Sequence, residues 1–145
     1  MKKKIFKIIV TVLILVIVFF ISLPALLNKA GLHPDYNSKK YNFSDKKAVI
    51  ISTSHSILSK PGETTGKLTG VFASELTVPY YEFTDSGFEV DIASIKGGEI
   101  PIDPESFFYV VKTSSDDRYL EDPVLKEKVN NSIKIDELEI DNYDL

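Results

Sequence analysis

Uninterrupted and alternating runs of apolar residues divide the chain into one long N-terminal segment and several short ones. From Ile8 to Leu27 no charged residue occurs. About 20 apolar helical residues span a hydrocarbon core of roughly 30 Å, so this run predicts a transmembrane helix. Ala48–Thr53 is a short apolar run rich in β-branched residues, which predicts a strand buried on both faces. Phe88–Ser94 carries apolar residues between flanking glycines and predicts a second strand.

A third pattern, between the two predicted strands, indicates an amphipathic helix that ends before Gly87. Its apolar positions recur at nearly helical spacing and are Val71, Phe72, Leu76, Val78, Tyr80, Tyr81 and Phe83. Pro79 lies inside this helix and has no N–H, so the carbonyl of Glu75 lacks its helical hydrogen bond. The helix is therefore expected to be loosened or kinked where Glu75 lies.

The order strand, helix, strand predicts an α/β fold with two parallel strands, because such crossovers are nearly always right-handed βαβ units. Glycine and proline make Leu58–Lys67 and Gly97–Pro104 irregular loops in this prediction. Asp122-Pro123 combines an N-cap with proline at the first helical position and predicts a helix to about Asn131. A third strand is expected to begin in Asp141–Leu145. A parallel sheet needs helices on both faces, and two strands with two helices cannot provide them.

Charges around the long apolar run predict its orientation. Four lysines precede it, namely Lys2, Lys3, Lys4 and Lys7. Basic flanks remain in the cytoplasm, which places the N-terminus there and the following domain outside, as in a single-pass membrane protein. A cleaved signal peptide, giving a secreted domain, is the alternative, although its apolar region is usually only about 7–15 residues long. We expect a membrane anchor in residues 1–30 with residues 8–27 in the bilayer, a polar linker in residues 31–45 and a domain in residues 46–145.

Composition excludes several classes of function. The net charge is −4, or −8 once the four N-terminal lysines are subtracted, and an acidic domain is unsuited to nucleic acid. Cysteine is absent, and His33 and His55 are far apart, so no metal site is expected. The segment from Gly62 to Lys67 has three residues between its glycines where a phosphate loop has four, and leucine follows its lysine. We therefore expect neither nucleotide binding nor a cofactor.

Two residues are candidates for chemistry on their own pattern. His55 follows the first predicted strand, at the sheet edge where α/β proteins bind ligands, but a residue that only serves a turn would occupy the same place. Glu75 alone resembles a solvated helical glutamate. His55 with Ser54 or Ser56 is the only candidate nucleophile–base pair in the sequence. Adjacent residues rarely have the geometry in which a base can activate a nucleophile. Catalysis by these 145 residues alone is therefore not expected.

Several segments together match a known family in order and spacing. They are Ala48–Thr53 with Ser54-His55, Thr69-Gly-Val-Phe with Glu75 and Pro79-Tyr-Tyr, Gly87–Ser94, Gly97-Gly98, and Pro101-Ile-Asp103-Pro104. Through them Lys46–Leu145 resembles the amino-terminal portion of the ThiJ/PfpI superfamily of class I glutamine-amidotransferase-like proteins, most closely its heat-shock chaperone and glyoxalase III branch. The resemblance implies a flavodoxin-like doubly wound parallel sheet, of which this chain holds the first strands and helices.

The resemblance also implies a site. Glu75 occupies the position of the family's catalytic helix glutamate, and His55 and Asp103 are candidates to line the pocket. The family's nucleophilic cysteine, usually followed by histidine, would lie beyond Leu145. A carboxyl group that hydrogen-bonds a thiol and moves its proton must be buried enough to stay protonated, and we expect the largely apolar helix to bury Glu75 in this way.

Three functions remain open at this point. The first is a membrane-anchored protein whose full-length form resembles a cofactor-independent glyoxalase III or deglycase acting on small dicarbonyls such as methylglyoxal, this chain being inactive alone. The second is a holdase-type chaperone or non-catalytic binding module. The third is a truncated product without activity. A homodimer is an open alternative for each of them.

Overall fold

The computed structural model describes residues 2–31 and 41–145, so His33 and most of the predicted linker lie outside the described residues. The chain divides into two compact units, residues 1–37 with Tyr109–Val111, and Ser38–Phe108 with Lys112–Leu145. The first unit contains the helix α1, Lys2–Lys29, which includes Pro24 and has no buried residue. Among the described residues α1 is the one helix long and apolar enough to cross a membrane, and a signal sequence has the same properties.

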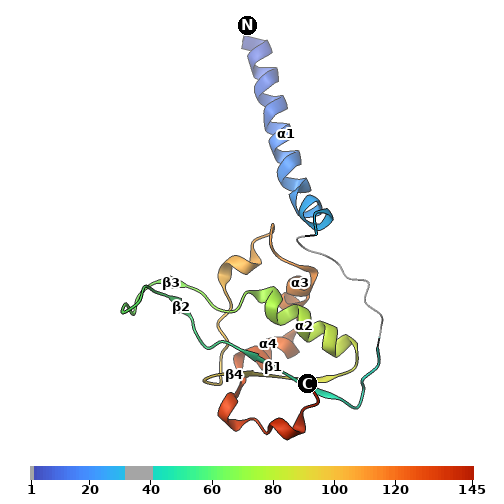
Figure 1. The fold of residues 1–145 in the computed structure, drawn as a ribbon. Coiled ribbons are helices and arrows are strands. Elements are labelled where there is room, and N and C mark those ends of the chain that lie inside the picture. The colour runs from blue at the N-terminus through green and yellow to red at the C-terminus, as the bar shows by residue number, and fades with distance from the viewer. Residues whose placement is uncertain (1, 32–40) are drawn as a thin grey trace. The chain divides into compact units, whose positions relative to one another are not determined.

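The second unit is a mixed α/β structure built on a three-stranded parallel sheet (Figure 1). Its strands are β1 (Lys47–Ser52), β4 (Glu89–Ser94) and β5 (Ile133–Lys134), in the order β1-β4-β5. β1 and β4 pair in parallel from Lys47↔Glu89 to Ser52↔Ser94, as the βαβ prediction requires. The third strand begins at Ile133 and not in Asp141–Leu145, where Ile140–Asn142 forms the 3₁₀ turn η3 instead.

β1 forms an edge of this sheet, and the expectation that both its faces are buried is wrong. Ile51 is 52% exposed. On the side away from β4, β1 meets the last two residues of the chain: Asp144 N donates to Lys47 O at 2.7 Å, and Val49 N donates to Leu145 O at 3.0 Å. An apolar run predicts a strand with apolar side chains on both of its faces. Whether each face is buried depends on elements that are distant in the sequence.

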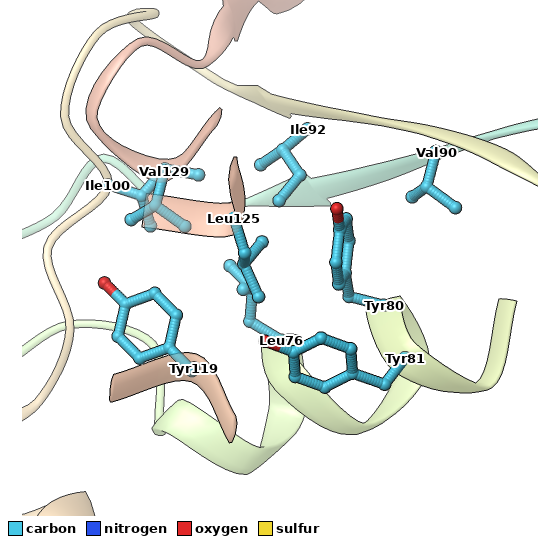
Figure 2. Packing of buried hydrophobic residues seen from close by; sticks show 9 residues of the cluster. All are labelled: Leu76, Tyr80, Tyr81, Val90, Ile92, Ile100, Tyr119, Leu125 and Val129. Atoms are coloured by element: carbon cyan, nitrogen blue, oxygen red, sulfur yellow. The ribbon is translucent and has the colours of Figure 1, made fainter. Parts of the chain in front are cut away.

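Three helices pack with β4 into one apolar core. They are α2 (Ala73–Asp85), α3 (Ser114–Glu121) and α4 (Pro123–Asn130). The buried cluster consists of Leu76, Tyr80, Tyr81, Val90, Ile92, Ile100, Tyr119, Leu125 and Val129. Figure 2 shows the side chains of α2 and α4 meeting Val90 and Ile92 of β4. α4 begins as predicted, because the Asp122 carboxylate caps the free N–H groups of Val124 and Leu125.

Local backbone contacts set both ends of α2. Val71 stays outside the helix because it bridges to Ile102, so α2 begins at Ala73. At the other end Gly87 adopts φ of 93° and donates to Thr84 O, while Phe88 N donates to Phe83 O at 3.0 Å. This pair of bonds is a Schellman motif, and it confirms the predicted stop at Gly87. The rings of Phe83 and Phe88 pack over it with centroids 5.5 Å apart.

The loops contain more structure than the sequence indicated. The stretch expected to be irregular between Leu58 and Lys67 is closed by an antiparallel hairpin of β2 (Ile57–Leu58) and β3 (Lys67–Leu68). Gly66 permits this hairpin, because a Cβ there would lie 2.0 Å from the carbonyl oxygen of Leu58. Short 3₁₀ turns, η1 (Pro104–Phe107) and η2 (Ile135–Glu137), occupy two further connections.

Candidate functional site

An open pocket of about 550 Å³ lies at the carboxyl end of β1. Its walls come from the end of β1, the segment that follows it, the hairpin and the first turn of α2. The lining residues are Ile50, Ile51, Ser52, Thr53, His55, Leu58, Thr69, Gly70, Val71, Glu75 and Leu76. The structure therefore brings His55 and Glu75, 20 positions apart in the sequence, to one pocket at the sheet edge where α/β proteins bind ligands.

Glu75 lies in the first turn of α2 and is exposed. This differs from the expectation that the apolar helix buries it. Leu76 and Thr77 are turned into the core, at 1% and 0% exposure, and each helical residue is rotated about 100° from its neighbour, so Glu75 is turned out of it. Within the part of the chain that the structure describes, its carboxylate has no hydrogen bond or ion pair, which leaves both oxygens available to a ligand.

Pro79 does not interrupt α2, which runs from Ala73 to Asp85. Pro79 lies inside α2, so it gives the carbonyl of Glu75 no N–H donor. The N-cap residue Phe72 offers no side-chain cap, and Glu75 N is bonded to Phe72 O at 2.9 Å. The first turn of α2 is thus held by a tight backbone bond and by the contacts of its inward side chains.

His55 is exposed and follows β1 in a segment held by other side chains. Its backbone N–H donates to Thr53 Oγ1 at 2.9 Å, and Ser54 Oγ accepts from Lys96 N at 2.9 Å. The threonine and serine therefore stabilise this turn, and among the described residues the imidazole of His55 has no hydrogen-bond partner, which leaves it available to the pocket. Ser52 has a buried Oγ without a hydrogen-bond partner among the described residues, and sequence reasoning did not single it out.

Asp103 is not among the residues that line this pocket. Its carboxylate caps η1 by accepting from Glu105 N at 2.8 Å, and it accepts from Thr69 Oγ1 at 3.2 Å. Thr69 does line the pocket, so Asp103 supports one wall from behind.

The chemistry available in the pocket is proton transfer. One carboxylate and one imidazole are exposed at its walls, and the sequence has no cysteine to act as a thiol nucleophile. Within residues 2–31 and 41–145 no group of three or more His, Asp or Glu side chains is placed to hold a metal ion. The site thus has residues suited to acid–base catalysis and lacks a strong nucleophile.

Known structures resemble this unit. The 24 kDa rapid encystment protein of Francisella tularensis is 37% identical, with a TM-score of 0.59 over 68% of this chain. The chain is related to the ThiJ/PfpI-like proteins. Glyoxalase III of Candida albicans is 24% identical with a TM-score of 0.57 over 70% of this chain, which is a likeness of fold. The chain spans 41% of the length of each structure. No protein-family model and no curated protein matches it.

Proposed function

We propose that these residues are the amino-terminal part of a membrane-anchored ThiJ/PfpI-like protein whose full-length form acts on small dicarbonyls such as methylglyoxal without a cofactor. The proposal includes a flavodoxin-like doubly wound sheet, of which β1, β4 and β5 form part. Two facts support a larger whole: each solved relative is more than twice as long as the segment it shares, and β1 lies at an edge with Ile51 exposed. The dicarbonyl substrate is suggested by the Candida protein, which is a glyoxalase III.

The observation that carries the proposal is the shared pocket of Glu75 and His55. In the proposed reaction the carboxyl group of Glu75 takes up and returns a proton while a thiol attacks one carbonyl carbon of the dicarbonyl. The carboxylate of Glu75 takes up the proton that the thiol loses and returns it to the oxyanion that forms on attack, so that a neutral hemithioacetal results. His55 lies at the same wall and donates a hydrogen bond to the second carbonyl oxygen of the substrate in this scheme.

The thiol is the component that these residues do not supply. A thiol reacts as its thiolate, and the sequence contains no cysteine. We propose that the nucleophilic cysteine comes from residues other than these 145, and that the 145-residue chain alone does not turn over methylglyoxal.

The membrane part of the proposal rests on α1. Ile8–Leu27 would cross the bilayer, with Lys2, Lys3, Lys4 and Lys7 on the cytoplasmic side and the α/β unit outside. A secreted form released by signal cleavage is the alternative, since a signal sequence has the same apolar character. The anchor is supported if the protein stays with the membrane after an alkaline carbonate wash and still begins at residue 1. A mature N-terminus after residue 27 would contradict it.

Turnover by the longer protein tests the role of Glu75. Sequencing the coding region downstream of the Leu145 codon establishes whether the reading frame continues to a cysteine. In that longer protein, Glu75→Gln should lower the rate of methylglyoxal loss by at least about 100-fold, the usual contribution of acid–base catalysis. The matched control is Glu121→Gln, which changes an exposed glutamate of α3 outside the pocket. Equal activity of Glu75→Gln and Glu121→Gln would refute the role assigned to Glu75.

A chaperone is the second candidate, and the hairpin favours it. Leu58 and Leu68 are both 63% exposed, and Ile51 is 52% exposed, so apolar surface is available at and near the pocket. Exposed apolar surface of this kind is typical of proteins that hold unfolded clients. Suppression of client aggregation by the chain, abolished in the Leu58→Ser, Leu68→Ser double variant and unaffected by Glu75→Gln, would favour this function over catalysis.

A further inference from the structure

A run of five apolar residues, Phe107–Val111, connects η1 to α3. Phe108 is 60% exposed and Tyr109 is 52% exposed, so two neighbouring aromatic rings lie at the surface. Phe107 is half-buried, and its ring stacks on Tyr119 of α3 with centroids 6.2 Å apart and planes inclined by 15°. Phe107 thus packs in the α/β unit and Phe108 is exposed, whereas Tyr109 belongs to the unit that contains α1 and donates its hydroxyl to Phe20 O of that helix.

The backbone holds this loop in a defined turn. Phe108 N donates to Glu105 O at 3.2 Å, and Lys112 N donates back to Phe108 O at 2.9 Å. The fully buried Ser106 precedes the loop, and Thr113, two positions after Val111, begins the capping box of α3. Two aromatic side chains on such a fixed turn lose little conformational entropy when they bind a partner, so the loop is suited to contact.

Neighbouring exposed aromatic rings occur at Phe108–Tyr109 and also at Tyr41–Phe43, whose rings stack with centroids 5.8 Å apart, but Phe43 packs in addition on Phe88 of the α/β unit. Leu120 and Val124 are also exposed, but they lie on the helices α3 and α4, where single apolar residues are ordinary. Because Phe108 is 60% exposed and Tyr109 is 52% exposed, the two side chains together offer about 170–280 Å² of surface to bury. Tyrosine is in addition a residue that favours the boundary between lipid and water, since its ring is apolar and its hydroxyl is polar.

We propose that the Phe107–Val111 loop inserts Phe108 and Tyr109 into the interfacial layer of the bilayer that α1 spans. This inference rests on the membrane anchor of the proposed function. Tyr41 follows Lys29 by 12 positions, and a chain of that length extends at most about 40 Å, so the anchor keeps the domain close to the membrane. A bilayer is therefore the apolar partner that the chain itself places within reach of this loop.

The charges near the loop indicate which kind of membrane contact is expected. Lys112 follows the loop, and its ammonium group pairs with the carboxylate of Asp117. On the other side of the loop, Glu105 pairs with Lys67 at 2.7 Å. The paired charges leave the loop without a basic patch, so insertion should depend on its aromatic rings and should be insensitive to salt and to anionic lipid.

A single tryptophan can test this contact, because the sequence has none. The full chain carrying Phe108→Trp is reconstituted into phosphatidylcholine vesicles, with and without brominated acyl chains. We expect a blue-shifted emission and about twofold quenching by the brominated lipid, unchanged between 0.1 and 1 M salt, as for an interfacial aromatic residue. Val124→Trp is the matched control, since Val124 is 59% exposed on α4, and its emission should not be quenched. Tyr109→Trp provides a second reading at the adjacent position.

The outcomes separate the loop from the anchor. If the chain stays with the vesicles after an alkaline wash but residues 108 and 109 are quenched no more than residue 124, the loop proposal is refuted and the anchor stands. A blue shift without lipid quenching indicates a protein surface as the partner and refutes insertion. If the wash releases the chain, the anchor is refuted and the loop proposal with it.

Discussion

Thr77 and Asp116 form a fully buried hydrogen bond that joins α2 to α3, and its removal is our most quantitative prediction. Thr77 Oγ1 donates to Asp116 Oδ1 at 2.6 Å, and both residues are 0% exposed. The other carboxylate oxygen accepts from Thr113 N at 2.7 Å and from Thr113 Oγ1 at 2.8 Å. Because Thr77 lies two positions after Glu75, this bond also fixes the helix that carries the candidate acid.

The expected loss of stability follows from the number of hydrogen bonds that the Asp116 carboxylate accepts. Thr77→Val removes one of three hydrogen bonds to a buried carboxylate while keeping the shape of the side chain, so we expect a loss of about 1.5–3 kcal/mol in the free energy of unfolding. Asp116→Asn keeps an acceptor for Thr113 and turns an amide toward Thr77, which should cost about 1–2 kcal/mol. Since both changes affect the same bond, the double variant should lose less than the sum by about 1 kcal/mol or more.

Urea unfolding of the full chain in micelles, followed by near-ultraviolet circular dichroism, measures these losses. The signal reports the core, because Tyr80, Tyr81 and Tyr119 are buried there. With a denaturant slope of about 1–2 kcal/mol per molar, Thr77→Val should lower the midpoint by about 1–2 M. The control is Thr84→Val in the same helix, whose hydroxyl bonds only to backbone carbonyls of α2. Equal midpoints for the two valine variants, or additive losses in the double variant, would refute this reasoning.

Two further predictions concern pH and backbone packing. Burial of Asp91 raises its pKa, but hydrogen bonds from Lys47, Tyr143 and Lys128 outweigh that effect and hold the pKa below its usual value. The ionised Asp91 therefore stabilises the folded state above about pH 4, and this contribution is lost as the pH falls through the lowered pKa of the folded state. Asp91→Asn should make the free energy of unfolding less dependent on pH in the acidic range. An unchanged pH dependence would contradict this. A Cβ at Gly70 would lie 2.1 Å from Pro101 O, so Gly70→Ala should cost more than about 2 kcal/mol in urea unfolding. A Cβ at Gly62 would have no atom within 4 Å, so Gly62→Ala should lower the free energy of unfolding by only about 1 kcal/mol, because the φ of Gly62 is positive. Equal losses for Gly70→Ala and Gly62→Ala would count against this explanation.

The elements predicted correctly from the sequence are those whose signals are local. The apolar run of β1, the glycine stop of α2 and the Asp122-Pro123 start of α4 each lie within a few residues of the element they define. The helix α3 was missed because its eight residues hold one buried aromatic, Tyr119, and so lack an apolar period. Its signal was the capping box of Thr113 and Asp116, which requires no apolar pattern.

Features that depend on distant parts of the chain could not be predicted. β5 has only two residues, and its pairing of Ala93 with Ile133 joins positions 40 apart. The exposure of Ile51 likewise depends on which elements cover the sheet. Local chemistry cannot show either arrangement.

The residues of the candidate site also differ in how far local sequence signals predict their positions. His55 could be placed at the pocket because the carboxyl end of a parallel strand is the usual ligand edge. Asp103-Pro104 repeats the Asp122-Pro123 pattern of a helix N-cap, and the Asp103 carboxylate caps η1 as that of Asp122 caps α4.

The exposure of Glu75 sets a condition on the proposed chemistry. A carboxyl group that donates a hydrogen bond to a thiol at neutral pH must be shielded from water, because desolvation is what favours its protonated form. Glu75 is exposed on an open pocket and has no partner among the described residues, so nothing in these residues provides that shielding. The proposed reaction therefore requires that the part of the protein carrying the cysteine, or the bound substrate, also covers Glu75. The acid and its nucleophile would then be activated by the same closure, since one contact would bring the thiol to the carboxyl group and exclude water from both.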